Sequence, residues 1–140
     1  MRLRGPKKMI RVLIVDDHAF VRAQITRVMS EATGIVVVGE CTDGAEVPSM
    51  AALVQPDVVL MDVRMPRTSG TVATAQLMAQ RSSARVMMLT GSPSSSTMAA
   101  AALAGAVGFL PKDCGAHRLV SAVRTVAAGG TAWPERAVAS

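Results

Sequence analysis

Five short runs of apolar residues recur along the chain, and each is followed by a segment with a helical pattern. The runs cover residues 10–15, 35–38, 58–61, 85–89 and, more weakly, 107–110. A nearly continuous apolar run of this length is typical of a strand that is buried on both faces of a parallel sheet. Strands that alternate with helices favour right-handed crossovers, which place helices on both faces of the sheet. The sequence therefore predicts an α/β fold with five parallel strands.

Helices are expected after each of these strands. The clearer ones cover residues 20–29, a segment beginning near Ser69, residues 98–104 before Gly105, and residues 119–126 before Gly129 and Gly130. The second helix, between residues 44 and 54, is harder to place, because Pro48 lacks a backbone N–H and disfavours helix in the residue before it. We therefore expect that helix to begin at Pro48 or to be kinked there.

The positive charge of the chain is concentrated at its N-terminus. The net charge of the 140 residues is +5, and five basic residues lie among the first eleven, which leaves ten basic and ten acidic residues elsewhere. A nucleic-acid surface is more often a folded basic face with stacking aromatic residues, but the chain has only two Phe, one Trp and no Tyr. We therefore predict that residues 1–9 form a disordered basic leader, that residues 10–130 form one domain, and that this chain does not bind DNA directly.

The hydrophobic pattern also bears on where the protein acts. No apolar run approaches the length of a membrane-spanning helix, and the basic N-terminus lacks the apolar stretch of a secretory signal. This pattern predicts a cytoplasmic protein that does not enter a membrane. The two cysteines, Cys41 and Cys114, match no zinc or redox motif, so we expect both to be reduced thiols.

Polar side chains that could carry chemistry follow four of the five predicted strands. Asp16 and Asp17 follow the first strand, Asp62 ends the third, Thr90 follows the fourth and Lys112 follows the fifth. Because ligands bind beyond the carboxyl ends of parallel strands, we expect these side chains to converge at one edge. Three carboxylates repel one another unless a cation offsets them, and oxygen ligands without His or Cys favour Mg²⁺ over a transition metal.

Each of these residue types suits a role in phosphoryl chemistry. Asp62 ends a buried strand, so its fixed carboxylate could act as the nucleophile that forms an aspartyl phosphate. Asp17 and Asp16 would hold Mg²⁺, directly and through water. Lys112 would offset charge on the phosphoryl group, and Thr90 would offer its hydroxyl to a phosphoryl oxygen.

Each residue also has a structural explanation when it is taken alone. Asp17 could be only a helix N-cap, a Lys near a sheet edge is usually solvated, and a Thr at the end of a strand often caps a turn. The occurrence of Asp16, Asp17, Asp62, Thr90 and Lys112 at the proper strand ends of one chain favours a functional site.

Several motifs, spread from residue 10 to about residue 130, carry a family resemblance. They are LIVDDH (13–18), PDVVLMDVRMP (56–66), Gly70, MLTG (88–91) and AGAVGFLPKD (104–113). Together they resemble the receiver domains of bacterial two-component response regulators. The segment RLVSAVRTVAAGGTAWPE (118–135) resembles the last helix and exit segment of NarL/FixJ-type regulators, the subfamily with a LuxR-type helix-turn-helix.

The resemblance implies both a fold and a chemistry. The fold would be a flavodoxin-like (βα)5 sandwich with strand order 2-1-3-4-5. Asp62 would accept a phosphoryl group from the phosphohistidine of a sensor histidine kinase. Asp17, Asp62 and the backbone carbonyl of Arg64 would bind Mg²⁺, with Asp16 assisting.

The resemblance also implies a switch and an output. Thr90 would move toward the phosphoryl group and Phe109 would turn inward behind it, which would change the face formed by the fourth helix, the fifth strand and the fifth helix. We expect homodimerisation on phosphorylation and control of transcription through a DNA-binding domain that this chain lacks. Residues 131–140 would then be an exit segment toward that domain.

Two other classes of function compete with a phosphorylation switch. A haloacid-dehalogenase-type phosphatase also uses an Asp nucleophile and Mg²⁺, but it needs a second Asp two residues later, where this chain has Arg64. A receiver-like domain that no longer accepts phosphate would have lost some of the five polar residues, and all are present. We therefore expect a signalling switch that catalyses only its own phosphorylation and dephosphorylation.

Overall fold

Five parallel strands form the centre of the molecule. The computed structural model describes residues 8–134. The strands are β1 (Ile10–Val15), β2 (Ile35–Cys41), β3 (Val58–Asp62), β4 (Arg85–Thr90) and β5 (Gly108–Pro111). Their order in the sheet is β2-β1-β3-β4-β5, and all neighbouring pairs are parallel. The predicted flavodoxin-like fold and its strand order 2-1-3-4-5 are confirmed.

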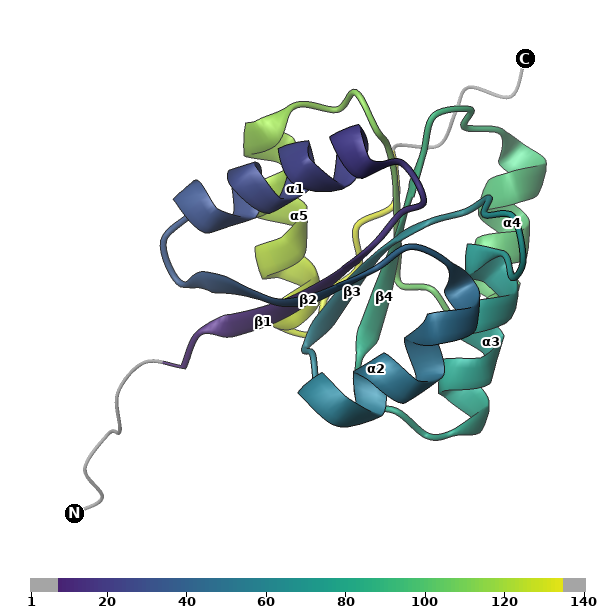
Figure 1. Ribbon diagram of the computed structural model, residues 1–140. Coiled ribbons are helices and arrows are strands. Elements are labelled where there is room, and N and C mark those ends of the chain that lie inside the picture. The colour runs from purple at the N-terminus through teal and green to yellow at the C-terminus, as the bar shows by residue number, and fades with distance from the viewer. Residues whose placement is uncertain (1–7, 135–140) are drawn as a thin grey trace.

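Helices cover both faces of this sheet (Figure 1). They are α1 (Ala19–Glu31), α2 (Val47–Val54), α3 (Gly70–Ala79), α4 (Ser95–Ala104) and α5 (Ala116–Ala127), with a short 3-10 helix at Gly44–Glu46. Helices α1 and α5 lie on one face, and α2, α3 and α4 lie on the other. Each strand therefore contributes side chains to two separate hydrophobic cores.

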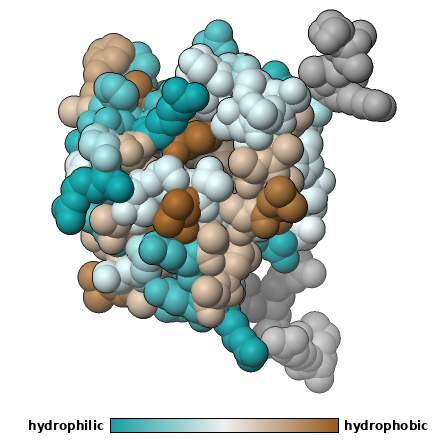
Figure 2. Space-filling view, turned by 90° about the vertical axis from the view of Figure 1, so that its right-hand side faces the viewer, coloured by the Kyte–Doolittle hydropathy of each residue, from teal (hydrophilic) through white to brown (hydrophobic). Residues whose placement is uncertain are grey.

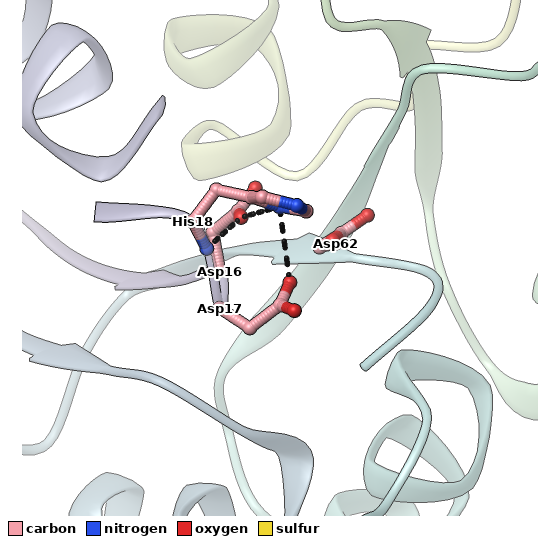
Figure 3. A group of neighbouring side chains, drawn as sticks. All are labelled: Asp16, Asp17, His18 and Asp62. Atoms are coloured by element: carbon pink, nitrogen blue, oxygen red, sulfur yellow. Dashed lines mark hydrogen bonds and ion pairs between the residues drawn. The ribbon is translucent and has the colours of Figure 1, made fainter. Parts of the chain in front are cut away.

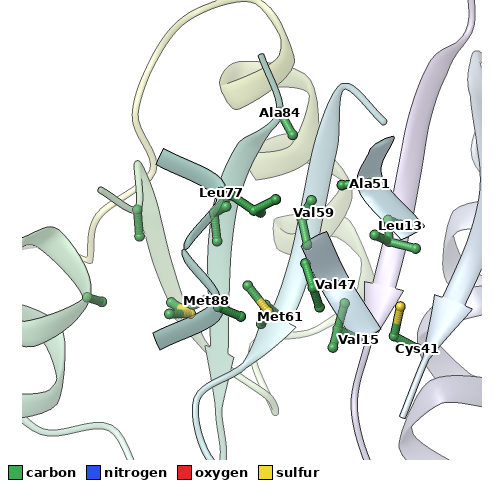
Figure 4. Close-up of a cluster of buried hydrophobic side chains, with 14 of the residues drawn as sticks. Leu13, Val15, Cys41, Val47, Ala51, Val59, Met61, Leu77, Ala84 and Met88 are labelled. Carbon is green, nitrogen blue, oxygen red and sulfur yellow. The ribbon is translucent and has the colours of Figure 1, made fainter. Parts of the chain in front are cut away.

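The two cores follow from the alternation of side chains along the strands. Leu13 of β1 and Met61 of β3 point into the cluster beneath α2, α3 and α4, which Figure 4 shows. Their neighbours Ile14 and Leu60 point into the cluster beneath α1 and α5. All four side chains are at most 1% exposed. Burial on both faces explains why the strands are continuous apolar runs rather than alternating ones.

Two helix starts differ from the sequence prediction. Helix α4 begins at Ser95 rather than at residue 98, because the Ser94 hydroxyl accepts a hydrogen bond from the backbone N–H of Thr97 at 3.1 Å and caps the helix there. Helix α2 begins at Val47, one residue before the predicted start. Pro48 lies in its first turn, where a missing N–H costs no helical hydrogen bond.

The two ends of the domain were predicted as a leader and an exit segment. Residues 8 and 9 precede β1 without regular secondary structure, and residues 1–7 of the predicted leader lie outside the described part. In the predicted exit segment, Ala132 forms a parallel bridge with Gly108 of β5, and residues 135–140 lie outside the described part. Among residues 8–134, no helix is both long enough and apolar enough to cross a lipid bilayer.

The side of the molecule formed by α3 and α4 carries little charge. Between residues 68 and 111 the only charged residues are Arg81 and Arg85. Val72, Met78 and Leu103 are exposed hydrophobic side chains on these two helices. Figure 2 looks onto this side and shows separate hydrophobic spots among paler and hydrophilic side chains. This face therefore meets solvent mainly through small and neutral side chains.

Candidate functional site

The predicted polar residues meet at the carboxyl edge of the sheet. Lys112 Nζ lies 2.7 Å from Asp16 Oδ2 and 3.3 Å from Asp62 Oδ2, so one ammonium group pairs with carboxylates that follow two neighbouring strands. The Asp16 and Asp62 side chains are 1% and 7% exposed, and that of Lys112 is 20% exposed. Lys112 is therefore not a solvated edge lysine, which was the structural alternative.

Asp16 is fixed by contacts on every side. Its Oδ1 accepts the backbone N–H of His18 at 2.8 Å, while Oδ2 faces Lys112. Its own backbone N–H donates to the carbonyl of Cys41 at 3.1 Å, and its carbonyl accepts from Arg22 Nη1 at 2.8 Å. Both carboxylate oxygens are thus already engaged within the protein.

Asp17 lies beside Asp16 but has a different environment. Its Oδ1 is buried and accepts no hydrogen bond from the residues that the structure describes. The N-cap position of α1 is His18, and no side chain caps that helix. The alternative that Asp17 serves only as an N-cap is therefore wrong, and its carboxylate does not pair with Lys112 as those of Asp16 and Asp62 do.

A histidine belongs to this cluster, contrary to the sequence analysis, which placed no His or Cys among the site residues. His18 Nδ1 lies 3.2 Å from Asp16 Oδ1 and 3.2 Å from Asp17 Oδ1 (Figure 3). Potential ligand atoms of Asp16, Asp17, His18 and Asp62 all lie within 4.8 Å of one another. The turn after β1 folds the His18 side chain back over the two carboxylates, which the sequence spacing did not reveal.

Burial and charge act against each other on the titratable groups. Burial raises the pKa of Asp62 above its ordinary value, the Asp16 carboxylate raises it further, and Lys112 acts in the opposite direction. Burial alone would lower the pKa of Lys112, but Asp16 and Asp62 together raise it above its ordinary value. Lys112 therefore stays charged, as the one ammonium group in a cluster that holds three carboxyl groups.

Thr90 ends β4 and Phe109 lies within β5, on the last two strands of the chain. Thr90 is 6% exposed, and its hydroxyl accepts the backbone N–H of Ser92 at 3.1 Å, which is the turn-capping role expected of a structural threonine. The backbone N–H of Lys112 donates to the Thr90 carbonyl at 2.8 Å. Phe109 is 2% exposed and belongs to the core beneath α4. The switching roles of Thr90 and Phe109, and the ligand role of the Arg64 carbonyl, stay predictions.

Sequence reasoning missed Asp43, which holds the loop after β3. The Asp43 carboxylate accepts backbone N–H groups from Ala45 at 2.9 Å, from Arg67 at 3.0 Å and from Thr68 at 3.0 Å. Burial disfavours its charge, but these hydrogen bonds and the Arg67 guanidinium lower the pKa of Asp43. The spacing of Asp43 and Glu46 matches a capping box, and this local signal could have identified the residue.

Gly70 holds α3 against the end of β3, and replacing it tests this packing. Its backbone N–H donates to the carbonyl of Val63 at 2.8 Å, and a Cβ at this position would collide with the backbone carbonyl of Asp62. We expect Gly70→Ala to lower the free energy of unfolding by about 3 kcal/mol, as overpacking against backbone does. Urea unfolding measures this loss.

Gly91 provides the matched control for Gly70→Ala. It also follows a strand at this edge, but a Cβ at Gly91 would meet no heavy atom within 4 Å. Gly91→Ala should therefore change the unfolding midpoint little. Equal midpoints for the two variants would contradict the packing of Gly70 against Asp62.

Comparison with known proteins agrees with this fold. Residues 12–124 match the family described as the response regulator receiver domain. The match covers most of the chain, so the protein belongs to the response regulator receiver domain family. Its sequence is 39% identical over 121 residues to response regulator GacA of Pseudomonas aeruginosa and 39% identical over 121 residues to response regulator UvrY of Escherichia coli. Both alignments cover 86% of this chain and 56% of the relative, so the chain spans about half the length of these relatives.

Solved structures point to the same group. The signal receiver domain of the putative response regulator NarL from Mycobacterium tuberculosis superposes with a TM-score of 0.85 at 33% identity, covering 87% of this chain and 98% of that one. A LuxR-family two-component response regulator from Aurantimonas superposes with a TM-score of 0.85 at 31% identity, covering 89% of each chain. The predicted receiver family, of the NarL/FixJ type, is confirmed.

Proposed function

We propose that this domain is a phosphorylation-dependent switch in which Asp62 accepts a phosphoryl group from the phosphohistidine of a sensor histidine kinase. The observation that carries the proposal is the position of Lys112 Nζ, 2.7 Å from Asp16 and 3.3 Å from Asp62, with the Asp17 carboxylate beside them. A buried carboxylate beside one cation and two further carboxylates suits an acceptor that works together with a metal ion.

The residues present fit Mg²⁺. Asp17 would be a direct ligand, because its carboxylate lies in the cluster without pairing with Lys112, and Asp62 and the Arg64 carbonyl would be the other protein ligands. Asp16 would act through water, because His18 and Lys112 already engage its two oxygens. When bound, Mg²⁺ would supply positive charge that offsets the incoming phosphoryl oxygens. The carboxylate-rich donor set favours this hard cation even with His18 nearby.

The transfer itself breaks one bond and forms another. The bond between phosphorus and the kinase imidazole nitrogen breaks, and its electron pair returns to that nitrogen. A new bond forms between phosphorus and a carboxylate oxygen of Asp62, which must be deprotonated to attack. Lys112 favours that charged form and then offsets charge on the phosphoryl group.

The signal would leave the site through Thr90 and Phe109. A phosphoryl group adds nearly two negative charges, so the Thr90 hydroxyl would exchange its bond with Ser92 for one to a phosphoryl oxygen. Phe109 would then turn toward the space that Thr90 leaves. The resulting change in the face of α4, β5 and α5 would promote homodimerisation and, in a longer protein, control transcription through a DNA-binding domain. We do not expect residues 10–130 themselves to bind DNA.

An enzyme that hydrolyses phosphate esters is a poorer fit to this site. Such a phosphatase needs an acid-base carboxyl group two residues after its nucleophile, and here that residue is the exposed Arg64. A guanidinium group stays protonated in proteins and cannot fill that role.

Phosphorylation by a small-molecule donor tests the proposed function. We expect incubation with acetyl phosphate and Mg²⁺ to add the mass of one phosphoryl group to the intact protein, and we expect a chelator to prevent it. Intact-mass spectrometry reads this directly. A protein whose mass stays unchanged with acetyl phosphate and with phosphoramidate would contradict the proposal.

A further inference from the structure

The chain does not leave the domain after α5 but turns back to the sheet, as the yellow segment in Figure 1 shows. Gly129 has a φ of +100°, and the backbone N–H of Gly130 donates to the carbonyl of Thr125 at 2.9 Å. A Cβ at Gly130 would lie 2.9 Å from Thr125 Cγ2. The two glycines therefore allow a tight reversal that a larger residue would open.

The residues after this turn, 131–134, are called the edge segment here, and they pair with β5. The backbone N–H of Phe109 donates to the carbonyl of Ala132 at 3.0 Å, and the N–H of Ala132 donates to the carbonyl of Val107 at 3.0 Å. Gly108 lies opposite Ala132, and a Cβ there would approach the Ala132 carbonyl oxygen to 3.2 Å and Met87 Cγ to 2.8 Å. Ala132 thus takes the place of a sixth strand at an edge that would otherwise be open.

Trp133, the next residue, anchors the edge segment. It is partly buried and packs against the hydrophobic cluster that contains Phe109. Pro134 and Phe109 both line a neighbouring cavity of about 300 Å³, together with Met98 and Arg118. The edge segment therefore contacts the strand and the core residue that are expected to change on phosphorylation.

Strand β5 joins this segment to the acceptor site. Phe109, whose N–H holds Ala132, is three residues from Lys112, whose ammonium group pairs with Asp16 and Asp62. The backbone N–H of Lys112 is also bonded to the carbonyl of Thr90. A change of charge at Asp62 acts on Lys112 at one end of β5, and the edge segment is bonded to the other end.

We propose that the edge segment is docked on β5 in the unphosphorylated domain and is released when Asp62 is phosphorylated. The proposal rests on the proposed function. A phosphoryl group draws Lys112 and Thr90 toward itself, and Phe109 turning behind Thr90 withdraws from the cluster against which Trp133 packs. Release frees the N–H of Phe109 and the carbonyl of Val107 at the edge of the sheet.

Trp133 is the only tryptophan of the chain, so its fluorescence reports docking without a label. Beryllofluoride with Mg²⁺ serves as the phosphoryl mimic. We expect it to shift the emission to longer wavelength and to raise the acrylamide quenching constant about twofold, because it moves the population from docked to released. Asp62→Asn should show neither change, which separates release from a direct effect of the additive.

A variant that cannot dock tests the reverse direction of the coupling. Ala132→Pro removes the N–H that donates to Val107, so Trp133 should be as accessible without the mimic as it is in the parent with it. Because coupling is reciprocal, this variant should bind beryllofluoride about fivefold more tightly than the parent. Trp133→Ala, which removes the packing anchor, should tighten binding in the same way. Thr131→Ala is the control, because Thr131 is exposed, and it should behave as the parent.

The outcomes separate this inference from the proposed function. If acetyl phosphate does not label the protein, the proposed function fails. If the protein is labelled and the mimic is bound, but Trp133 stays equally protected, the release of the edge segment is wrong. Unchanged affinity for the mimic in both Ala132→Pro and Trp133→Ala would also overturn it.

Discussion

Asp62→Asn is expected to take up no phosphoryl group under conditions that label the parent domain fully. An amide oxygen is a far poorer nucleophile than a carboxylate, and the substitution keeps the size of the side chain at the end of β3. Lys112 retains its closer partner, Asp16, at 2.7 Å, so the site should keep its shape. Intact mass after incubation with acetyl phosphate and Mg²⁺, followed by peptide mapping, measures the effect.

Asp57 offers a matched control near the opposite end of the same strand. It directly precedes β3, and its Oδ2 accepts the backbone N–H of Arg11 at 2.8 Å, a bond that the oxygen of an Asn can also accept. Asp57→Asn should therefore be labelled to the same extent as the parent. Full labelling of Asp62→Asn, or loss of labelling in Asp57→Asn, would show that the acceptor lies elsewhere.

The sequence alone predicted the fold well because its strands are buried on both faces. A strand such as β3, with every residue buried, must be an apolar run, and the first polar residue after such a run marks the edge of the sheet. That rule located Asp16, Asp62 and Lys112, which the structure brings into contact. The parallel direction of the strands is enough to place these three residues at the same edge of the sheet.

Contacts that depend on the path of a turn could not be predicted from the pattern of apolar runs. His18 was visible in the motif after β1, but only the turn shows that its ring lies 3.2 Å from both Asp16 and Asp17. Asp43 bonds to Arg67 and Thr68, which are 24 and 25 residues away in sequence. Local patterns carry no information about partners at that distance.

The start of α4 and the path beyond α5 show two further limits. Apolar spacing placed the start of α4 at residue 98, whereas the Ser94 cap begins it three residues earlier, before any apolar side chain of the helix. Ala132 lies in a segment expected to lead away from the domain, and its pairing with β5 depends on the turn at Gly129 and Gly130. In both cases hydrogen bonds of the backbone, rather than hydrophobic periodicity, determine the structure.

Asp17→Asn is expected to change the stability of the domain in opposite directions with and without Mg²⁺. Without the metal, Asp17 adds a negative charge beside Asp16 and Asp62, and its buried Oδ1 receives no hydrogen bond from the described residues. Removing that charge should raise the free energy of unfolding by about 1 kcal/mol, the scale of a charge pair near the surface. Urea unfolding in the presence of a chelator measures this gain.

With Mg²⁺ the order should reverse. A ligand that binds only the folded state at 100 times its dissociation constant stabilises the parent by about 2.7 kcal/mol. Asp17→Asn lacks a carboxylate that lies in the cluster without pairing with Lys112, so at the same Mg²⁺ concentration it should gain much less. The parent would then be the more stable of the two proteins. This reversal depends on folding alone and needs no phosphoryl donor.

This reversal in the order of stability shows whether Asp17 is a metal ligand or only a charge that destabilises the folded domain. If Asp17 only repels its neighbours, Asp17→Asn will be the more stable protein with and without Mg²⁺. If Asp17 only supports the turn before α1, the variant will be the less stable one under both conditions. Asp57→Asn, which removes a carboxylate near the opposite end of β3, should gain as much from Mg²⁺ as the parent. Equal stabilisation of Asp17→Asn and the parent by Mg²⁺ would remove Asp17 from the set of direct ligands and leave Asp62 and the Arg64 carbonyl to hold the ion without it.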